Sequence, residues 1–191
     1  MCGRYHFSVD GSDELLQILQ EIRNAGGDFT PGELTPASTA PVLIARKQAV
    51  VPTLMRWGFQ TQESLVINAR AETARDKPLF RGGIAAQRCL IPASGFYEWD
   101  AARRKFLFTV PGEQAFYMAG IYRVREDQSH YCILTTAAND SMRPTHPRMP
   151  LILRRDQLEP WLRDLDAALK LLHSQPPSLE RTSAEPQLSL W

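Results

Sequence analysis

The sequence lacks the features that would place it in a membrane or outside the cell. It has 191 residues and no long hydrophobic run. Its opening, MCGRYHFSVDG, holds no apolar segment followed by a small-residue cleavage site, so we expect neither a membrane span nor a secretion signal. It also lacks an excess of charge, with a formal net charge of +1, so any nucleic-acid site has to be a local patch. We therefore expect one cytoplasmic, monomeric globular domain.

Cysteine is scarce, and its spacing suits neither disulfides nor metals. Cys2, Cys89 and Cys132 form no CxxC pair. No spacing of His, Cys or carboxylate residues resembles a metal site, so we expect no metal and no other cofactor. Cys89 and Cys132 lie in the apolar runs RCLIP and YCILT and are expected to be small buried hydrophobic residues. Cys2 is the cysteine left for chemistry.

Lysine is rare as well, occurring only at positions 47, 77, 105 and 170, so arginine supplies most of the positive charge. The planar guanidinium of arginine pairs with phosphate through two hydrogen bonds and stacks on bases. GC-biased codon usage produces the same composition, and on composition alone it is the favoured interpretation.

Short β-type runs are the main structural signal, and they predict an α+β domain over residues 1–175. We expect a mainly antiparallel sheet or irregular barrel with peripheral helices. One helix is expected from the cap Ser12 to Arg23, and another over 157–173 if Pro160 lies in a first turn or restarts the helix. Residues 176–191 have the composition of a flexible tail. The β-type runs are PVLIAR (41–46), AVVPTLMRWGF (49–59), SLVINAR (64–70), KFLFTV (105–110), QAFYMAGIY (114–122) and HYCILTTA (130–137).

Cys2 gains unusual chemistry if Met1 is removed, which happens when the second residue is small. The product is an amine of pKa about 7.7 to 8.0 beside a thiol of pKa about 8.5. With an aldehyde, the amine forms an imine and the thiol then closes on the same carbon, giving a five-membered thiazolidine. By itself, a small residue at position 2 is more often present for processing alone.

Four segments in this order, MCGRY, SLVINARAET, CLIPASGFYEW and THPRMPLIL, resemble the SRAP (SOS response-associated peptidase) family over residues 1 to about 155. The resemblance implies an α+β domain that crosslinks to abasic sites in single-stranded DNA through its N-terminal cysteine, in the DNA damage (SOS) response. The family is also described as an autoproteolytic thiol peptidase. A bacterial member would be associated with the nucleoid.

The resemblance also implies an active site of Cys2, Asn68, Glu98 and His146. Cys2 would be the nucleophile, and Glu98 would move protons between the amine and the leaving hydroxyl. His146, held between two prolines, would act as the acid that opens the sugar ring. Asn68 would orient Cys2 or the deoxyribose. Without the resemblance, Glu98 would more simply be a surface residue of a strand.

A further set of residues is expected to contact DNA, by pairing with phosphate or stacking on bases. Each has a plainer alternative: the tryptophans as core residues, and Glu72 with Arg75 as an ordinary helix pair. The chain departs from the family pattern at Gly32-Glu33-Leu34, where members carry an asparagine, and in its last residues. The expected DNA contacts are Arg4, Pro36, Trp57, Arg70, Arg75, Trp99 and Arg148.

Two other functions stay open at this point. The chain would act as a hydrolase if Cys2 cleaved peptide bonds, including the Met1–Cys2 bond, although a nucleophile at the extreme terminus has little chain around it to build an oxyanion hole. It would be a non-covalent reader of single-stranded DNA if Cys2 were merely processed. The crosslinking activity, which is lyase-like, is the favoured hypothesis.

Overall fold

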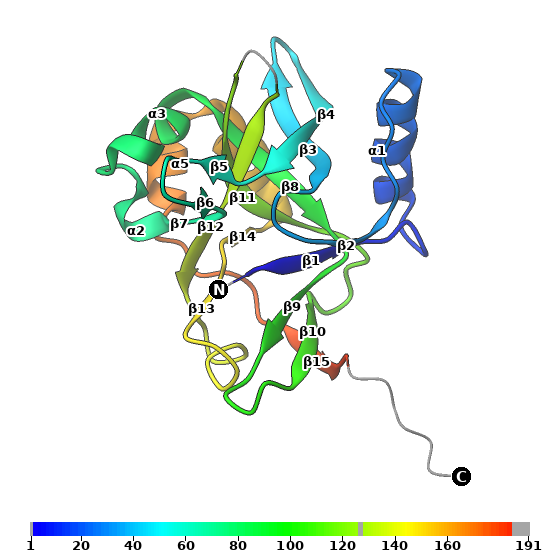
Figure 1. Cartoon of the computed structure of the whole chain (residues 1–191), viewed down its shortest axis with the longest axis vertical. Coiled ribbons are helices and arrows are strands. Elements are labelled where there is room, and N and C mark those ends of the chain that lie inside the picture. Colours follow the sequence, from blue (N-terminus) through cyan, green and yellow to red (C-terminus); the bar gives the residue numbers. More distant parts are fainter. Residues whose placement is uncertain (1, 126–127, 185–191) are drawn as a thin grey trace.

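The computed structural model describes residues 2–125 and 128–184, and it confirms the predicted α+β fold with sheets rich in antiparallel pairs. Figure 1 shows β1 crossing the middle of the molecule, with most strands and helices above it and β9, β10 and β15 below. The lower, five-stranded sheet has the order β15-β10-β9-β1-β2. Its strands are β15 (Glu180–Ser183), β10 (Lys105–Thr109), β9 (Gly95–Trp99), β1 (Arg4–Phe7) and β2 (Gly32–Leu34).

The larger sheet closes into the irregular barrel that the sequence predicted. Strand β12 pairs with β4 on one side and with β11 on the other, so the path β12-β4-β3-β8-β11 returns to its start. Strand β7 pairs with β12 in parallel, and a two-stranded ribbon of β5 (Phe59–Gln60) and β6 (Leu65–Val66) stands beside it. The strands of the larger sheet are β3 (Thr39–Arg46), β4 (Ala49–Trp57), β7 (Asn68–Arg70), β8 (Arg88–Ala93), β11 (Phe116–Arg123), β12 (His130–Ala137), β13 (Arg148–Pro150) and β14 (Ile152–Leu153).

Buried aromatic residues join the two sheets. Tyr5 of β1 and Tyr131 of β12 share a hydrogen bond of 2.6 Å between their hydroxyl groups. Trp57 stacks on Tyr131 with ring centroids 6.3 Å apart, and it meets Tyr5 edge-on. All three side chains are fully buried. This packing fixes the start of β1, and with it Cys2, against the barrel.

Helices cover the outside of the sheets. In α1 (Asp13–Asn24), Ser12 accepts a hydrogen bond from the Leu15 amide at 3.3 Å, as an N-cap does. The predicted C-terminal helix is divided at Asp164, and Pro160 lies in the first turn of α4, where proline is tolerated. The other helical elements are α2 (Ala71–Ala74), α3 (Pro78–Ala86), the 3-10 turn η1 (Arg155–Gln157), α4 (Leu158–Arg163) and α5 (Leu165–Leu171).

The expectation of a flexible tail from residue 176 is wrong for the residues up to 184. Strand β15 pairs with β10, and the preceding Leu179 is buried. Arg181 extends over the Phe106 ring at 4.5 Å and donates to Thr145 Oγ1 at 3.0 Å. The segment ERTS is exposed and carries no apolar alternation, so its strand depends on backbone pairing with a distant partner. Residues 185–191 lie outside the described part of the chain.

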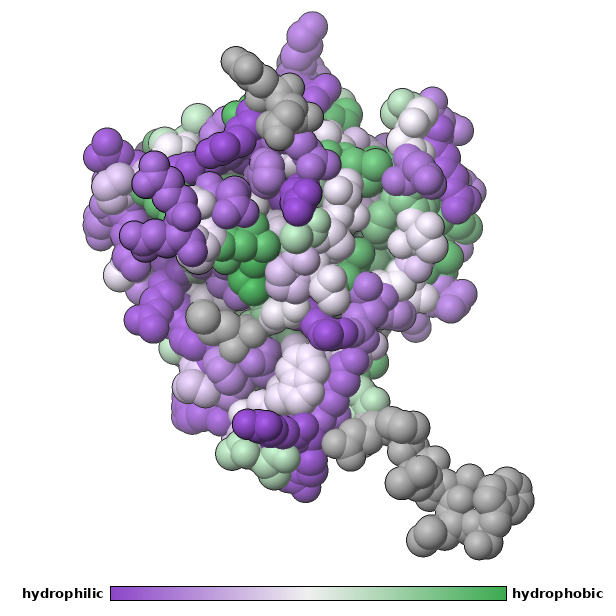
Figure 2. All heavy atoms as spheres, in the orientation of Figure 1, coloured by the Kyte–Doolittle hydropathy of each residue, from purple (hydrophilic) through white to green (hydrophobic). Residues whose placement is uncertain are grey.

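On the face drawn in Figure 2, hydrophilic side chains predominate and the hydrophobic ones form separated patches. Within residues 2–125 and 128–184, no helix combines the length and the apolar character needed to cross a bilayer.

Candidate active site

Cys2 lies just before β1 and is buried, with 1% of its surface exposed. Its Sγ is 3.8 Å from the backbone oxygen of Arg4. Burial raises the pKa of the Cys2 thiol well above its ordinary value, and the nearby negative charge of Glu98 raises it further. The thiol is therefore neutral at physiological pH, and it needs a group that accepts its proton when it reacts.

Glu98 is placed on the inner face of β9. Its neighbours Tyr97 and Trp99 point to the outer face, because successive side chains of a strand alternate. Glu98 is 5% exposed, so the structure excludes the plainer reading of a solvated surface carboxylate. Its Oε1 lies 3.7 Å from Nε2 of His146. Glu98 thus lies beside an imidazole and acts electrostatically on the Cys2 thiol.

His146 comes from the segment between β12 and β13, which Figure 1 shows extending toward the β9–β10 end of the molecule. Its Nδ1 accepts a hydrogen bond from the Arg148 backbone N–H at 3.0 Å, which leaves the proton of a neutral ring on Nε2, facing Glu98. The Arg148 carbonyl oxygen is also 3.0 Å from Nδ1 and can accept a hydrogen bond from it when the ring is charged. The same turn therefore provides a partner for either protonation state.

Asn68 reaches the site from β7, where Ala69 is buried and the side chains on either side of it point the other way, as predicted. Its Nδ2 donates a hydrogen bond to the backbone oxygen of Cys2 at 2.9 Å. Its Oδ1 is buried and has no hydrogen-bond partner among the described residues. The structure thus brings Cys2, Asn68, Glu98 and His146 together from four separate segments.

Arg148 lies beside this site but is engaged within the protein. Its guanidinium pairs with both oxygens of Glu72 at 2.6 and 2.9 Å and donates to the Thr135 backbone oxygen at 2.6 Å. Hydrogen bonding from Arg148 lowers the pKa of Glu72 below its ordinary value. Glu72, for which a helix pair with Arg75 was the plainer reading, therefore binds Arg148 instead.

The other predicted DNA contacts are divided by their exposure. Arg70, Arg75 and Pro36 are exposed, and Arg4 and Trp99 are partly exposed, so their side chains are accessible to a ligand. Trp57 is fully buried, and its Nε1 donates to a backbone oxygen inside the protein at 3.1 Å. The prediction that Trp57 stacks on a base is wrong, because this ring is a core residue.

Sequence reasoning missed two residues on the outer face of the lower sheet. Lys105 lies opposite Trp99 in the β10–β9 register, and its Nζ binds Glu33 of β2 at 2.7 Å. Glu33 also bonds to the guanidinium of Arg4. The departure from the family pattern at Gly32-Glu33-Leu34 was the available signal for Glu33. Nothing in the sequence set Lys105 apart except the rarity of lysine.

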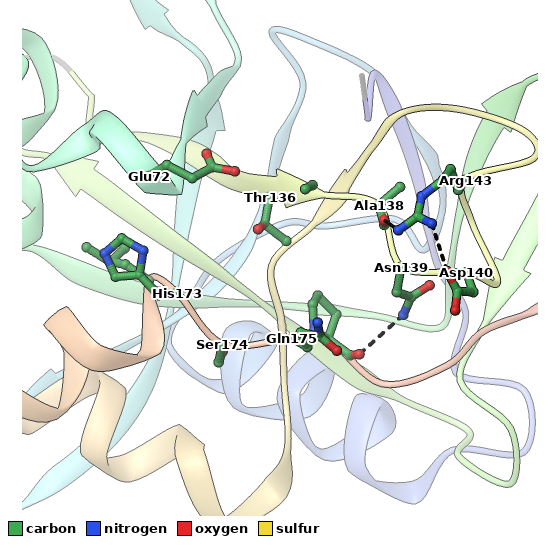
Figure 3. A pocket seen from close by; sticks show the side chains of 12 residues that line it. Glu72, Thr136, Ala138, Asn139, Asp140, Arg143, His173, Ser174 and Gln175 are labelled. Atoms are coloured by element: carbon green, nitrogen blue, oxygen red, sulfur yellow. Dashed lines mark hydrogen bonds and ion pairs between the residues drawn. The ribbon is translucent and has the colours of Figure 1, made fainter.

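Glu72 also lines a pocket of about 350 Å³ (Figure 3). Glu72 and His173 stand at one end, and Asp140 and Arg143 face each other at the other end. Asn139 donates from its amide to the backbone oxygens of Pro176, which lines the pocket, and of Pro177. The described residues that line this pocket do not include Cys2, Asn68, Glu98 or His146.

Comparison with known proteins identifies relatives along nearly the whole chain. A family profile described as SOS response associated peptidase (SRAP) matches residues 1–186. The abasic site processing protein YoaM of Bacillus subtilis is 29% identical over 191 aligned positions, covering 91% of this chain and 84% of that protein. The abasic site processing protein YoqW of the same organism is 30% identical, over 85% of this chain and 80% of that protein. A crystal structure of a protein from Bacteroides thetaiotaomicron superposes with a TM-score of 0.79 at 21% identity, covering 97% of this chain and 93% of that one, so it shares the fold.

Proposed function

Because the chain belongs to the SOS response-associated peptidase (SRAP) family, we propose that it processes abasic sites in single-stranded DNA by bonding covalently to them through Cys2. The observation that carries the proposal is the assembly of Cys2, Asn68, Glu98 and His146 in one site. The two relatives compared above are named abasic site processing proteins. Removal of Met1 converts the Cys2 nitrogen from an amide into a nucleophilic amine.

The first step opens the sugar. An abasic deoxyribose exists mainly as a cyclic hemiacetal, so its C1′ aldehyde forms only when the ring C–O bond breaks. His146 in its charged form donates the Nε2 proton to the ring oxygen and becomes neutral, while Glu98 accepts the proton of the C1′ hydroxyl. The backbone of Arg148 keeps the ring oriented through this exchange, because it offers a hydrogen-bond partner to Nδ1 in both states.

The second step joins protein and DNA. The Cys2 amine adds to C1′ and passes one proton to the new oxygen, which gives a hydroxyl. Glu98 then donates to that hydroxyl the proton it took in the first step, and water leaves to form an iminium. The thiol then adds to the same carbon, and its proton passes through Glu98 to His146, so both groups return to their starting states. The product is a thiazolidine and one water. Because the iminium is consumed, it no longer promotes β-elimination, and the strand stays whole.

Asn68 and the accessible cations would position the DNA strand. The partnerless Oδ1 of Asn68 is suited to accept a hydrogen bond from the Cys2 amine or from a sugar hydroxyl. Arg4, Arg70 and Arg75 are suited to pair with phosphates, and Trp99 to stack on a base. Arg148 contributes to this contact only if a phosphate takes the place of Glu72.

The test is an adduct that survives denaturation. Purified protein is mixed with a labelled single strand carrying one abasic site and then run on a denaturing gel. We expect a shifted band with the unaltered protein and with a Cys89→Ala control, which removes a buried thiol elsewhere. We expect no stable band with Cys2→Ser. A band of equal strength with Cys2→Ser would refute the assignment of the nucleophile.

A further inference from the structure

Glu33 holds two cations on the outer face of the five-stranded sheet. One carboxylate oxygen binds Lys105 Nζ at 2.7 Å, and the other binds the guanidinium of Arg4. The side chains are accessible to solvent, with 30% of Glu33 and 44% of Arg4 exposed. This arrangement places a negative charge between two positive ones. One of these, Arg4, begins β1 and is two residues after Cys2.

Two aromatic rings complete this outer-face cluster, which we define as Arg4, Glu33, Tyr97, Trp99 and Lys105. Lys105 Nζ lies 3.9 Å from the centre of the Tyr97 ring and 5.7 Å from that of Trp99. The Arg4 guanidinium is 6.0 Å from the centre of the Trp99 ring. Strand register pairs Arg4 with Tyr97 and Lys105 with Trp99, so all four side chains share one face.

Cations beside partly exposed aromatic rings match the chemistry of a nucleotide, because the cations pair with phosphate and the rings stack on a base. A phosphate and the Glu33 carboxylate would bind the same donors, since both are anionic oxygen acceptors. Partial burial acts to raise the pKa of Glu33, but hydrogen bonds from Lys105 and Arg4 outweigh it and lower the pKa. Glu33 is therefore charged at neutral pH and competes with DNA there.

We propose that Arg4 and Lys105 form a phosphate-binding pair for single-stranded DNA, and that Glu33 occupies this pair until a backbone phosphate displaces it. The inference rests on the proposed function, because it takes the DNA strand as the ligand. It adds Lys105 to the binding surface and assigns Glu33 the role of weakening the grip on DNA. Glu33 would thereby favour release from strands with which no covalent bond forms.

The test compares Glu33→Gln with Glu159→Gln in binding to an intact, fluorescein-labelled oligonucleotide without an abasic site. Glu159 pairs with Arg163 on α4, which packs on β8 of the other sheet, so the control removes the same charge and also an ion pair. In fluorescence anisotropy at low salt, we expect Glu33→Gln to bind about two- to tenfold more tightly, given the strength of exposed ion pairs. At about 1 M salt, where charges are screened within a few ångströms, the difference should vanish.

A double-mutant cycle separates competition from a structural effect. Lys105→Gln should weaken binding less than about twofold in the unaltered protein, where Glu33 neutralises the amine, and about threefold or more in the Glu33→Gln background. Equal affinities for Glu33→Gln and Glu159→Gln, or an equal cost of Lys105→Gln in both backgrounds, would overturn the inference. Adduct formation on an abasic strand is measured in parallel. If the unaltered protein forms no adduct, the proposed function is contradicted. The binding of the intact strand still tests the phosphate-binding pair separately.

Discussion

Asn68→Ala is expected to leave the stability of the fold nearly unchanged while slowing adduct formation. In the folded protein the Asn68 amide donates one hydrogen bond to the Cys2 backbone oxygen, at 2.9 Å, while its buried Oδ1 has no partner among the described residues. Losing the hydrogen bond leaves the buried Cys2 backbone oxygen without its donor and costs about 1 to 3 kcal/mol, whereas removing a buried acceptor that lacks a partner relieves a similar penalty of about 1 to 3 kcal/mol. The two effects nearly cancel, so we expect the free energy of unfolding to change by less than about 1 kcal/mol.

The same substitution should slow adduct formation strongly. When the Asn68 amide is removed, the Cys2 backbone oxygen loses the hydrogen bond that holds it, and the reacting sugar loses an acceptor. If the lost alignment raises the barrier by about 1.4 kcal/mol or more, the rate falls at least about tenfold. Urea unfolding measures the stability, and the time course of the gel-shifted adduct measures the rate.

Asn139→Ala is the matched control. The Asn139 amide donates to the backbone oxygens of Pro176 and Pro177 at 3.2 and 2.9 Å, and its Oδ1 accepts from the Ser141 hydroxyl at 2.6 Å. Removing this satisfied side chain should cost about 1 to 3 kcal/mol of stability and leave the adduct rate unchanged. A loss above about 2 kcal/mol for Asn68→Ala, or an unchanged adduct rate, would contradict the role given to Asn68.

Four further substitutions test the site and the residues around it. Glu98→Gln should slow adduct formation about 10²-fold or more, the usual contribution of a general acid–base group, and rapid-quench time courses would expose an unaltered rate. Trp57→Phe should lower the free energy of unfolding in urea by about 1 to 3 kcal/mol, because the Ile67 backbone oxygen loses its donor in the protein interior beside a fully buried ring. Trp99→Ala should instead weaken binding of single-stranded DNA, by about 1 to 3 kcal/mol in anisotropy titrations. Because pairing with Arg148 lowers the pKa of Glu72, the pair stabilises the fold above the unfolded-state pKa of about 4.3 and loses this effect as the pH falls through the lower folded-state value. Glu72→Gln should therefore show a smaller loss of stability on acidification, and an identical pH profile in urea unfolding would contradict the pairing.

The sequence predicted the elements whose signals are local. The cap at Ser12 and the apolar spacing after it predicted α1, and the run at 130–137 predicted β12. Strand β8 was not among the predicted runs, because it is buried on both faces, shows no alternation and contains Pro92. Closure of the barrel depends on which strands pair with β12, and that register links residues far apart in the chain.

The candidate site was predictable as a set of residues and not as a geometry. The family motifs named Cys2, Asn68, Glu98 and His146, and a resemblance of motifs carries no information on which atom faces which. Lys105 and Glu33 are 72 positions apart, so their ion pair appears only when β2 and β10 are placed in one sheet. Trp57 failed as a predicted DNA contact because a tryptophan near a motif looks the same in sequence whether it is exposed or buried.

We propose that Cys2, freed of Met1, condenses with an abasic aldehyde. Intact-mass spectrometry of the purified protein, before and after incubation with an abasic oligonucleotide, tests this most directly. We predict a protein mass lacking one methionine, then a new species whose mass is the sum of protein and oligonucleotide less one water. A fully processed protein that gives no such species would contradict the account.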